Sequence, residues 1–163
     1  MSVPKSKRKP NTELTAITKA VELEEYTIHI MSNPKYFPEE FRNTLTDEII
    51  SLSISIVDNL VKANSIRVSS DADYKVRRQF QQHAIGAILS MDAQLMVAKK
   101  VFKLKNQRYL FWTGLLSDVR NLTYAWKLND QNRYSKLKGG KATELEESIV
   151  STSPFKTLQD YKK

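Results

Sequence analysis

The sequence predicts an all-α protein, folded as an antiparallel up-down-up-down four-helix bundle. Apolar side chains recur at steps of three and four residues through four long segments, which are separated by short polar or Pro-containing breaks. One segment is rich in β-branched residues, but it continues without Gly or Pro for far longer than a typical strand. Four amphipathic helices joined by three short connections pack as a bundle, so each helix should have about 25 residues and span about 37 Å.

The first helix is expected to begin at Asn11 or Thr12, either of which is a suitable N-cap, and to end at Asn33-Pro34. Its apolar residues at helical spacing are Leu14, Ile17, Val21, Ile28 and Met31. The connection that follows, residues 35–38, reads Lys-Tyr-Phe-Pro.

The second helix is predicted from Glu39 to about Ile66. Pro38 suits the first position of a helix, and the carboxylates of Glu39 and Glu40 favour the helix dipole there. The apolar face is formed by Phe41, Leu45, Ile49, Leu52, Ile56 and Ala63, widened by Ile50, Val57 and Leu60.

The third helix is expected after Ser69-Ser70-Asp71, which is typical of a loop and a helix cap. Its apolar face contains Phe80, Ala84, Ala87, Met91, Leu95, Ala98 and Phe102. The fourth helix presents Trp112, Leu115, Leu116, Val119, Leu122 and Trp126, and ends at Gly139-Gly140. Tyr109, Phe111 and Tyr124 cannot all face inward with these residues, so part of this aromatic set is predicted to form an oligomer interface.

The chain of 163 residues has the size of one domain. We expect a basic N-terminal arm at residues 1–10, the bundle at 11–138 and a flexible tail at 139–163. The absence of Cys is consistent with a reducing compartment, and we find no apolar stretch typical of a signal peptide or a membrane span. These features predict a cytoplasmic protein, although the arm also resembles a nuclear localisation tract.

The sequence offers little material for catalysis. The only histidines are His29 and His83, which fall on different helices, and we find no metalloprotease, phosphate-binding or nucleophile motif. Adjacent acidic residues such as Glu24 and Glu25 point about 100° apart on a helix, which disfavours a shared metal ion. We therefore expect no catalytic residue, no metal and no cofactor.

Charge is distributed unevenly along the chain, whose net charge is +8. Residues 11–59 contain three basic and nine acidic residues, a net charge of −6, whereas residues 60–110 contain ten basic and three acidic residues, a net charge of +7. Clusters of Lys and Arg bind phosphate backbones through counterion release, and neighbouring Tyr rings stack on unpaired bases. This pattern predicts a nucleic-acid-binding protein.

In an up-down-up-down bundle these cations gather at the two ends. One end combines the basic arm, the connection between helices two and three and the end of helix four: Lys5, Lys7, Arg8, Lys9, Lys62, Arg67, Lys75, Arg77, Arg78, Arg133, Lys136 and Lys138. The opposite end combines Lys35 with Lys99, Lys100, Lys103, Lys105 and Arg108, partly balanced by Glu39 and Glu40. Apart from Lys35 and Lys138, all of the Lys and Arg residues at these two ends form the predicted nucleic-acid-binding set.

The second helix carries a recognisable pattern. Phe37-Pro38, Arg42, Leu45 and Ile49, followed by Ser55-Ile56-Val57-Asp58-Asn59-Leu60-Val61-Lys62-Ala63, resemble the four-helix-bundle family of ribosomal-RNA intervening-sequence proteins and the accessory variability determinant of diversity-generating retroelements. The resemblance covers roughly residues 12–138. Ser55, Ile56 and Asn59 match the family's Ser-Ile-x-x-Asn-Ile-Ala-Glu-Gly run, whereas Leu60 and Lys62 depart from it and its Gly is absent.

The resemblance implies a basic homopentamer that binds RNA or an RNA–DNA intermediate and a reverse transcriptase, and that supports mutagenic reverse transcription without being catalytic itself. The alternative is a structural protein-interaction module that uses the aromatic face of helix four and does not bind nucleic acid. In either case Arg42 and Asn59 are expected to act in packing or in hydrogen bonds between helices rather than in a binding site.

Overall fold

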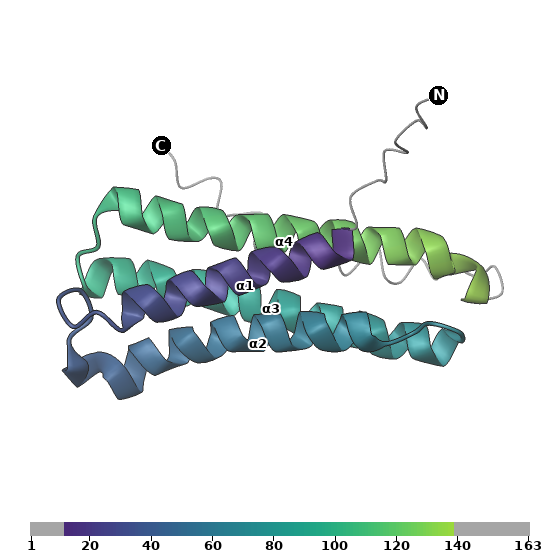
Figure 1. Cartoon of the computed structure of the whole chain (residues 1–163), viewed down its shortest axis with the longest axis horizontal. Coiled ribbons are helices and arrows are strands. Elements are labelled where there is room, and N and C mark those ends of the chain that lie inside the picture. Colours follow the sequence, from purple (N-terminus) through teal and green to yellow (C-terminus); the bar gives the residue numbers. More distant parts are fainter. Residues whose placement is uncertain (1–11, 139–163) are drawn as a thin grey trace, which may run out of the picture.

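The computed structural model describes residues 12–138, and every structural statement below concerns these residues. They form α1 (Thr12–Met31), η1 (Glu39–Phe41), η2 (Arg42–Thr46), α2 (Asp47–Ser65), α3 (Asp71–Val101), α4 (Asn106–Tyr134) and η3 (Ser135–Lys138), with no strand in this range. The four long helices lie side by side (Figure 1), and α2 and α4 each pack against both α1 and α3. The predicted all-helical architecture is confirmed.

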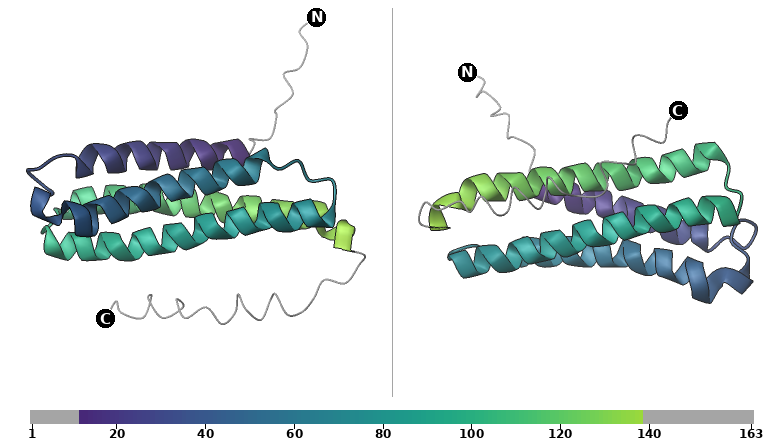
Figure 2. Two further views of the ribbon diagram at one scale, coloured as in Figure 1. Left: turned by 90° about the horizontal axis from the view of Figure 1, so that it is seen from below. Right: turned by 180° about the vertical axis from the view of Figure 1, so that it is seen from behind.

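The helix connections lie at alternating ends of the molecule. The α1–α2 and α3–α4 connections share one end, and the α2–α3 connection lies at the other (Figures 1 and 2). We call the first end the loop end, defined by residues 32–46 and 99–108. We call the second the α2–α3 end. The predicted basic arm and tail, residues 1–10 and 139–163, lie outside the described residues, so the predicted domain limits there stay predictions.

The helix boundaries largely follow the predicted signals. At the start of α3, the Ser70 hydroxyl accepts a hydrogen bond from the Asp73 backbone N–H, and the Asp73 carboxylate accepts one from the Ser70 N–H, which is a capping box. Hydrogen bonds from the hydroxyls of Ser69 and Ser70 lower the pKa of Asp73 to about 2. The second predicted helix is less regular, because its first two turns are a 3₁₀ turn and a π turn before α2 begins at Asp47.

The face of α1 that packs inward matches the predicted one only in part. Met31 is buried and Ile17 packs against the core, as predicted. Leu14, Val21 and Ile28 are exposed, whereas Ala16 and Ala20 are completely buried. Leu23 and Ile30 are buried on the same face as these alanines. The prediction was wrong here because it weighted the size of apolar side chains more than their periodic position.

The core is formed as predicted by the inward faces of α2, α3 and α4. Trp112 and Trp126 are fully buried, and the Trp112 indole N–H donates to the Thr27 hydroxyl on α1 at 3.0 Å. Phe111 and Tyr124 are exposed, which confirms that the aromatic residues of this helix cannot all face inward.

A buried polar cluster joins three helices near the α2–α3 end. The guanidinium of Arg77, 5% exposed, donates to both carboxylate oxygens of Asp130, 1% exposed, at 2.7 and 3.2 Å. It also donates to Glu13 on α1 at 2.9 Å and to the Ile66 carbonyl at 3.2 Å. The Gln81 amide donates to Asp130 at 2.8 Å. This cluster connects α1, α3, α4 and the α2–α3 connection.

Arg77 corrects one prediction from the sequence. It was expected on a nucleic-acid-binding surface, but its guanidinium is buried against Trp126 and satisfied by carboxylates and a carbonyl. The charge of a buried Arg with this many partners is not available to a ligand, and removing one of these partners destabilises the fold.

The polar contacts of two residues of the family-like pattern lie within their own segments. Asn59 donates to the carbonyl and the hydroxyl of Ser55 at 2.8 and 3.2 Å, so these hydrogen bonds lie within α2 rather than between helices. Arg42 is exposed and lies 3.7 Å from the Glu39 carboxylate.

We predict that Asp130→Ala lowers the free energy of unfolding by about 3–5 kcal/mol, because it leaves the buried Arg77 charge without its main partner. Asp118→Ala, at an exposed position of the same helix, is the matched control and should change it by less than about 0.5 kcal/mol. Urea denaturation followed by circular dichroism measures both values. Equal effects of the two substitutions would contradict the structural role of the pair.

Candidate nucleic-acid interface

The loop end carries a group of cations contributed by four parts of the chain. Lys35 lies in the connection after α1, two residues lie in the last turn of α3, two in the α3–α4 connection and one in the first turn of α4. Together they are Lys35, Lys99, Lys100, Lys103, Lys105 and Arg108. Lys99 and Arg108 are half-buried, and the other four are exposed.

The α3–α4 connection is a tight helix ending. Phe102 caps α3, Lys103 has a φ of 50°, and the Leu104 N–H donates to the Lys99 carbonyl at 3.1 Å. This is the hydrogen bond of a Schellman motif, whose left-handed position normally favours Gly. Leu104 is buried beneath it. Lys103 therefore occupies a conformation that is unfavourable for a residue with a side chain.

An aromatic cluster fixes the two connections of the loop end to each other. The buried Phe37 ring contacts Phe102 at a centroid distance of 4.9 Å and Trp112 at 6.2 Å, both edge-on. Phe41 of η1 contacts the same Phe102 ring at 5.3 Å. Edge-to-face aromatic pairs are favourable beyond the area that they bury. The segments that carry the cations of this end are therefore held together by packed aromatic rings.

Two of the cations lie over tyrosine rings. The Arg108 guanidinium is 3.8 Å from the centre of the Tyr36 ring, and the Lys99 ammonium is 4.4 Å from that of Tyr109. A hydrogen bond from Arg108, the charge of Arg108 and the charges of Lys35 and Lys105 lower the pKa of Tyr36. Three cations thus act on one phenol, which shows a concentration of positive charge at this point.

This positive charge is not neutralised by neighbouring acids. Within residues 12–138, none of the six loop-end cations forms an ion pair. Glu39, which was expected to balance this end in part, instead pairs with Arg42 at 3.7 Å.

The α2–α3 end has the opposite character. Lys62 pairs with Asp58 at 2.6 Å, and Lys75 pairs with Asp71 at 2.8 Å. Arg133 lies 3.6 Å from the Glu13 carboxylate. Most described cations predicted at this end therefore face a carboxylate.

The remaining residues of the predicted set are placed as follows. Arg67 is exposed in the α2–α3 connection, and the half-buried Arg78 donates to the Tyr74 hydroxyl at 2.9 Å. Lys5, Lys7, Arg8 and Lys9 and the side chain of Lys136 lie outside the described residues. The structure thus separates the set into a loop-end group and an α2–α3-end group, and removes Arg77 from the second.

Sequence reasoning missed the role of Tyr36 and left Lys35 out of the binding set. Both lie in the connection Lys35-Tyr36-Phe37-Pro38, to which the sequence analysis assigned a cation, a helix start and part of the family pattern but no binding residue. A Lys-Tyr pair beside a proline was the available signal, but its position next to Arg108 depends on the packing of two distant connections.

The described residues contain no group of three or more His, Asp or Glu side chains placed to hold a metal ion. None of the described helices is both long and apolar enough to cross a membrane. His29 and His83 are exposed, and His83 lies edge-on to Phe80 at a centroid distance of 6.4 Å.

We compared the chain with protein-family models, curated proteins and solved structures, and none of them matches.

We predict that Lys103→Gly raises the free energy of unfolding by about 1 kcal/mol, because Gly adopts a positive φ without steric cost. The matched control is Lys100→Gly, which removes the same charge from the last turn of α3 and should lower stability by about 1 kcal/mol. Thermal or urea denaturation gives both values. A loss of stability in Lys103→Gly would contradict the strained conformation.

Proposed function

We propose that this chain is a non-enzymatic nucleic-acid-binding protein that holds RNA or an RNA–DNA intermediate at the loop end of an antiparallel up-down-up-down bundle. The observation that carries the proposal is the set of loop-end cations without carboxylate partners. Cations that are already paired gain little from a phosphate, whereas unpaired ones release condensed counterions when they bind a nucleic-acid backbone.

The aromatic rings favour an unpaired strand as the ligand. Tyr36 and Tyr109 are half-buried beside the cations, so each ring is held in place while part of it stays accessible. Unpaired bases stack on Tyr rings and on Arg guanidinium planes, which bases inside a duplex cannot do.

The strained Lys103 supports the same proposal. A positive φ is tolerated at a non-Gly residue when another benefit compensates for it, and such positions gather at functional sites. Here the residue adds one more cation to the loop end. Gly at this position would favour the fold, so the charge is the property that distinguishes Lys103.

A narrower proposal follows from the family resemblance. If it holds, the chain is the accessory protein of a diversity-generating retroelement, acts as a homopentamer and binds the element's reverse transcriptase. Co-purification with a reverse transcriptase, together with the molar mass measured by light scattering, tests these two features separately from nucleic-acid binding.

The second candidate function is a protein-interaction module. It is favoured by large apolar side chains on α4 that lie open to solvent, namely Leu110, Phe111 and Leu128, which are 66%, 55% and 57% exposed. Such residues mark protein contacts when they lie together on a surface. This candidate predicts no salt-dependent affinity for RNA.

We predict that Lys35→Gln, Lys100→Gln and Lys105→Gln combined reduce the slope of log affinity against log salt for single-stranded RNA by about 2, since each neutralised phosphate contributes about 0.7. Fluorescence anisotropy with a labelled oligonucleotide at several salt concentrations measures the slope. A matched duplex DNA, measured in parallel, tests the preference for an unpaired strand.

The control variant removes the same number of charges from the α2–α3 end, with Lys62→Gln, Lys75→Gln and Arg133→Gln. Its slope should stay close to that of the unchanged protein, because each of these cations already has a carboxylate partner. Equal losses in the two variants would overturn the assignment to the loop end. Flat or absent binding by the unchanged protein would overturn nucleic-acid binding itself and favour the interaction module.

A further inference from the structure

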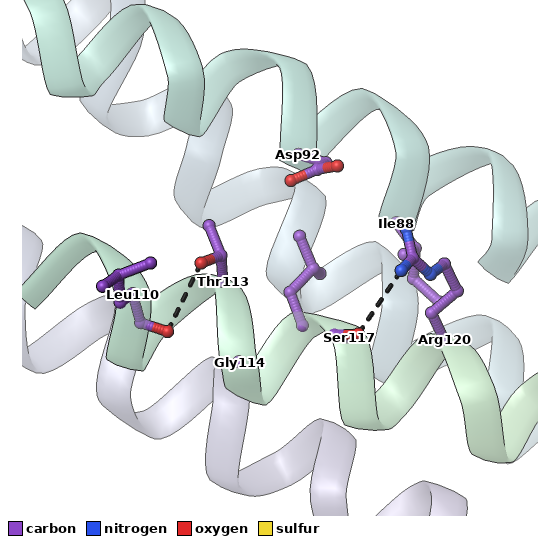
Figure 3. A pocket seen from close by; sticks show the side chains of 8 residues that line it. Ile88, Asp92, Leu110, Thr113, Gly114, Ser117 and Arg120 are labelled. Atoms are coloured by element: carbon purple, nitrogen blue, oxygen red, sulfur yellow. Dashed lines mark hydrogen bonds between the residues drawn. The ribbon is translucent and has the colours of Figure 1, made fainter. Parts of the chain in front are cut away.

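A small pocket lies between α3 and α4. Its volume is about 320 Å³, and its lining includes Asp92 from α3 and Leu110, Gly114, Ser117 and Arg120 from α4. In Figure 3 Asp92 lies opposite Thr113 and Gly114, and Arg120 lies farther along the groove toward Ile88. Ile88 and Asp92 are separated by one helical turn, about 6 Å along the axis.

The pocket contains two opposite charges that do not pair with each other. Asp92 and Arg120 are both half-buried, and neither forms an ion pair within residues 12–138. The Arg120 guanidinium donates one hydrogen bond, to the Ser117 hydroxyl at 3.3 Å. The fully buried charges Arg77 and Asp130, by contrast, pair with each other. A ligand that carries both charges would give Asp92 and Arg120 the partners that they lack.

Gly114 keeps the floor of this pocket open. A β-carbon added at Gly114 would meet no heavy atom within 4 Å, so no neighbouring side chain requires Gly there. Gly in the interior of a helix is less favourable than Ala. The space above it is therefore free for a ligand, and Thr113 and Ser117 place two further small polar residues beside it.

We propose that this pocket binds a small zwitterion, namely a free α-amino acid with an apolar side chain. The ligand carboxylate would accept hydrogen bonds from Arg120 and the Ser117 hydroxyl, and the ligand ammonium would donate to Asp92. The apolar side chain would lie against Ile88, Leu110 and Leu116, which complete the walls. A ligand with one charge leaves either Asp92 or Arg120 unpaired, so a zwitterion is preferred. The cavity has the volume of a site for a small ligand.

The test uses the full chain labelled with ¹⁵N and three probes of nearly equal shape. These are L-leucine, 4-methylpentanoate, which lacks the ammonium group, and 3-methylbutylamine, which lacks the carboxylate. The amide signal of Gly114 reports on the pocket, and that of Gly86, on α3 and outside the pocket lining, is the internal reference. We expect millimolar L-leucine to shift Gly114 but not Gly86, with an affinity at least about tenfold higher than that of either singly charged probe.

Three variants locate the contacts. Asp92→Asn should remove the preference for L-leucine over 4-methylpentanoate, and Arg120→Gln should remove its preference over 3-methylbutylamine. Gly114→Ala should stabilise the fold and weaken binding, whereas its control Gly86→Ala should stabilise the fold and leave binding unchanged, since added β-carbons meet nothing at either position. Weakened binding in a more stable protein cannot result from unfolding.

The proposal is overturned if L-leucine leaves the Gly114 signal in place, or if all three probes shift it equally. It is also overturned if Asp92→Asn and Arg120→Gln leave the order of the three affinities unchanged. None of these measurements involves nucleic acid, so their outcome is independent of the function proposed for the loop end.

Discussion

The ion pair between Arg77 and Asp130 is the constraint on which the arrangement of the helices depends. A guanidinium taken out of water is strongly unfavourable unless its N–H groups find acceptors. Here the acceptors come from α4, from α1 and from the carbonyl of Ile66, so they are available only when these parts of the chain are correctly aligned. An apolar core tolerates small shifts of one helix along another, whereas this cluster does not. Two atoms nearby, Gln81 Oε1 and Trp126 Nε1, are buried without a partner, so even the native arrangement does not satisfy every polar group.

The two ends of the bundle are held by different means, and this difference decides where charge is available. Cations of the α2–α3 end form ion pairs between helices, at Arg77 and Arg133, or within one helix, at Lys62 and Lys75. The loop end is held by the rings of Phe37, Phe41 and Phe102. Because aromatic rings pack without charged groups, no carboxylate is needed at this end, and the loop-end lysines remain without carboxylate partners. Helices of 19 to 31 residues carry the alignment from one end to the other. The loop end is thus held by aromatic packing and keeps unpaired cations, because the polar cluster of Arg77 and Asp130 lies near the opposite end.

Much of the fold was predictable because it depends on local patterns. Ser70 and Asp73 mark the start of α3, and the periodic apolar residues of α2, α3 and α4 identify the buried faces. The buried face of α1 was not predictable in this way, since Ala16 and Ala20 are weakly apolar and their burial depends on how closely another helix approaches. The site was less predictable than the fold. Arg77 lies seven residues before Ala84, so helical periodicity places it, rather than Arg78, on the buried face of α3. Its partner Asp130 is 53 residues away, and their pairing depends on how α3 packs against α4.

Three arginines show how the surroundings of one residue type determine what it does. Arg77 is enclosed by carboxylates and contributes to stability, Arg108 lies over the Tyr36 ring with no acid beside it, and Arg120 faces a pocket that also contains Asp92. A count of charges treats them as equal, and the net charge of +8 therefore says little about where a ligand binds. A cation next to a carboxylate has little to gain from a phosphate, whereas a cation against an aromatic ring keeps its full charge for an incoming anion. The availability of each cation, rather than their number, thus distinguishes the loop end from the rest of the surface.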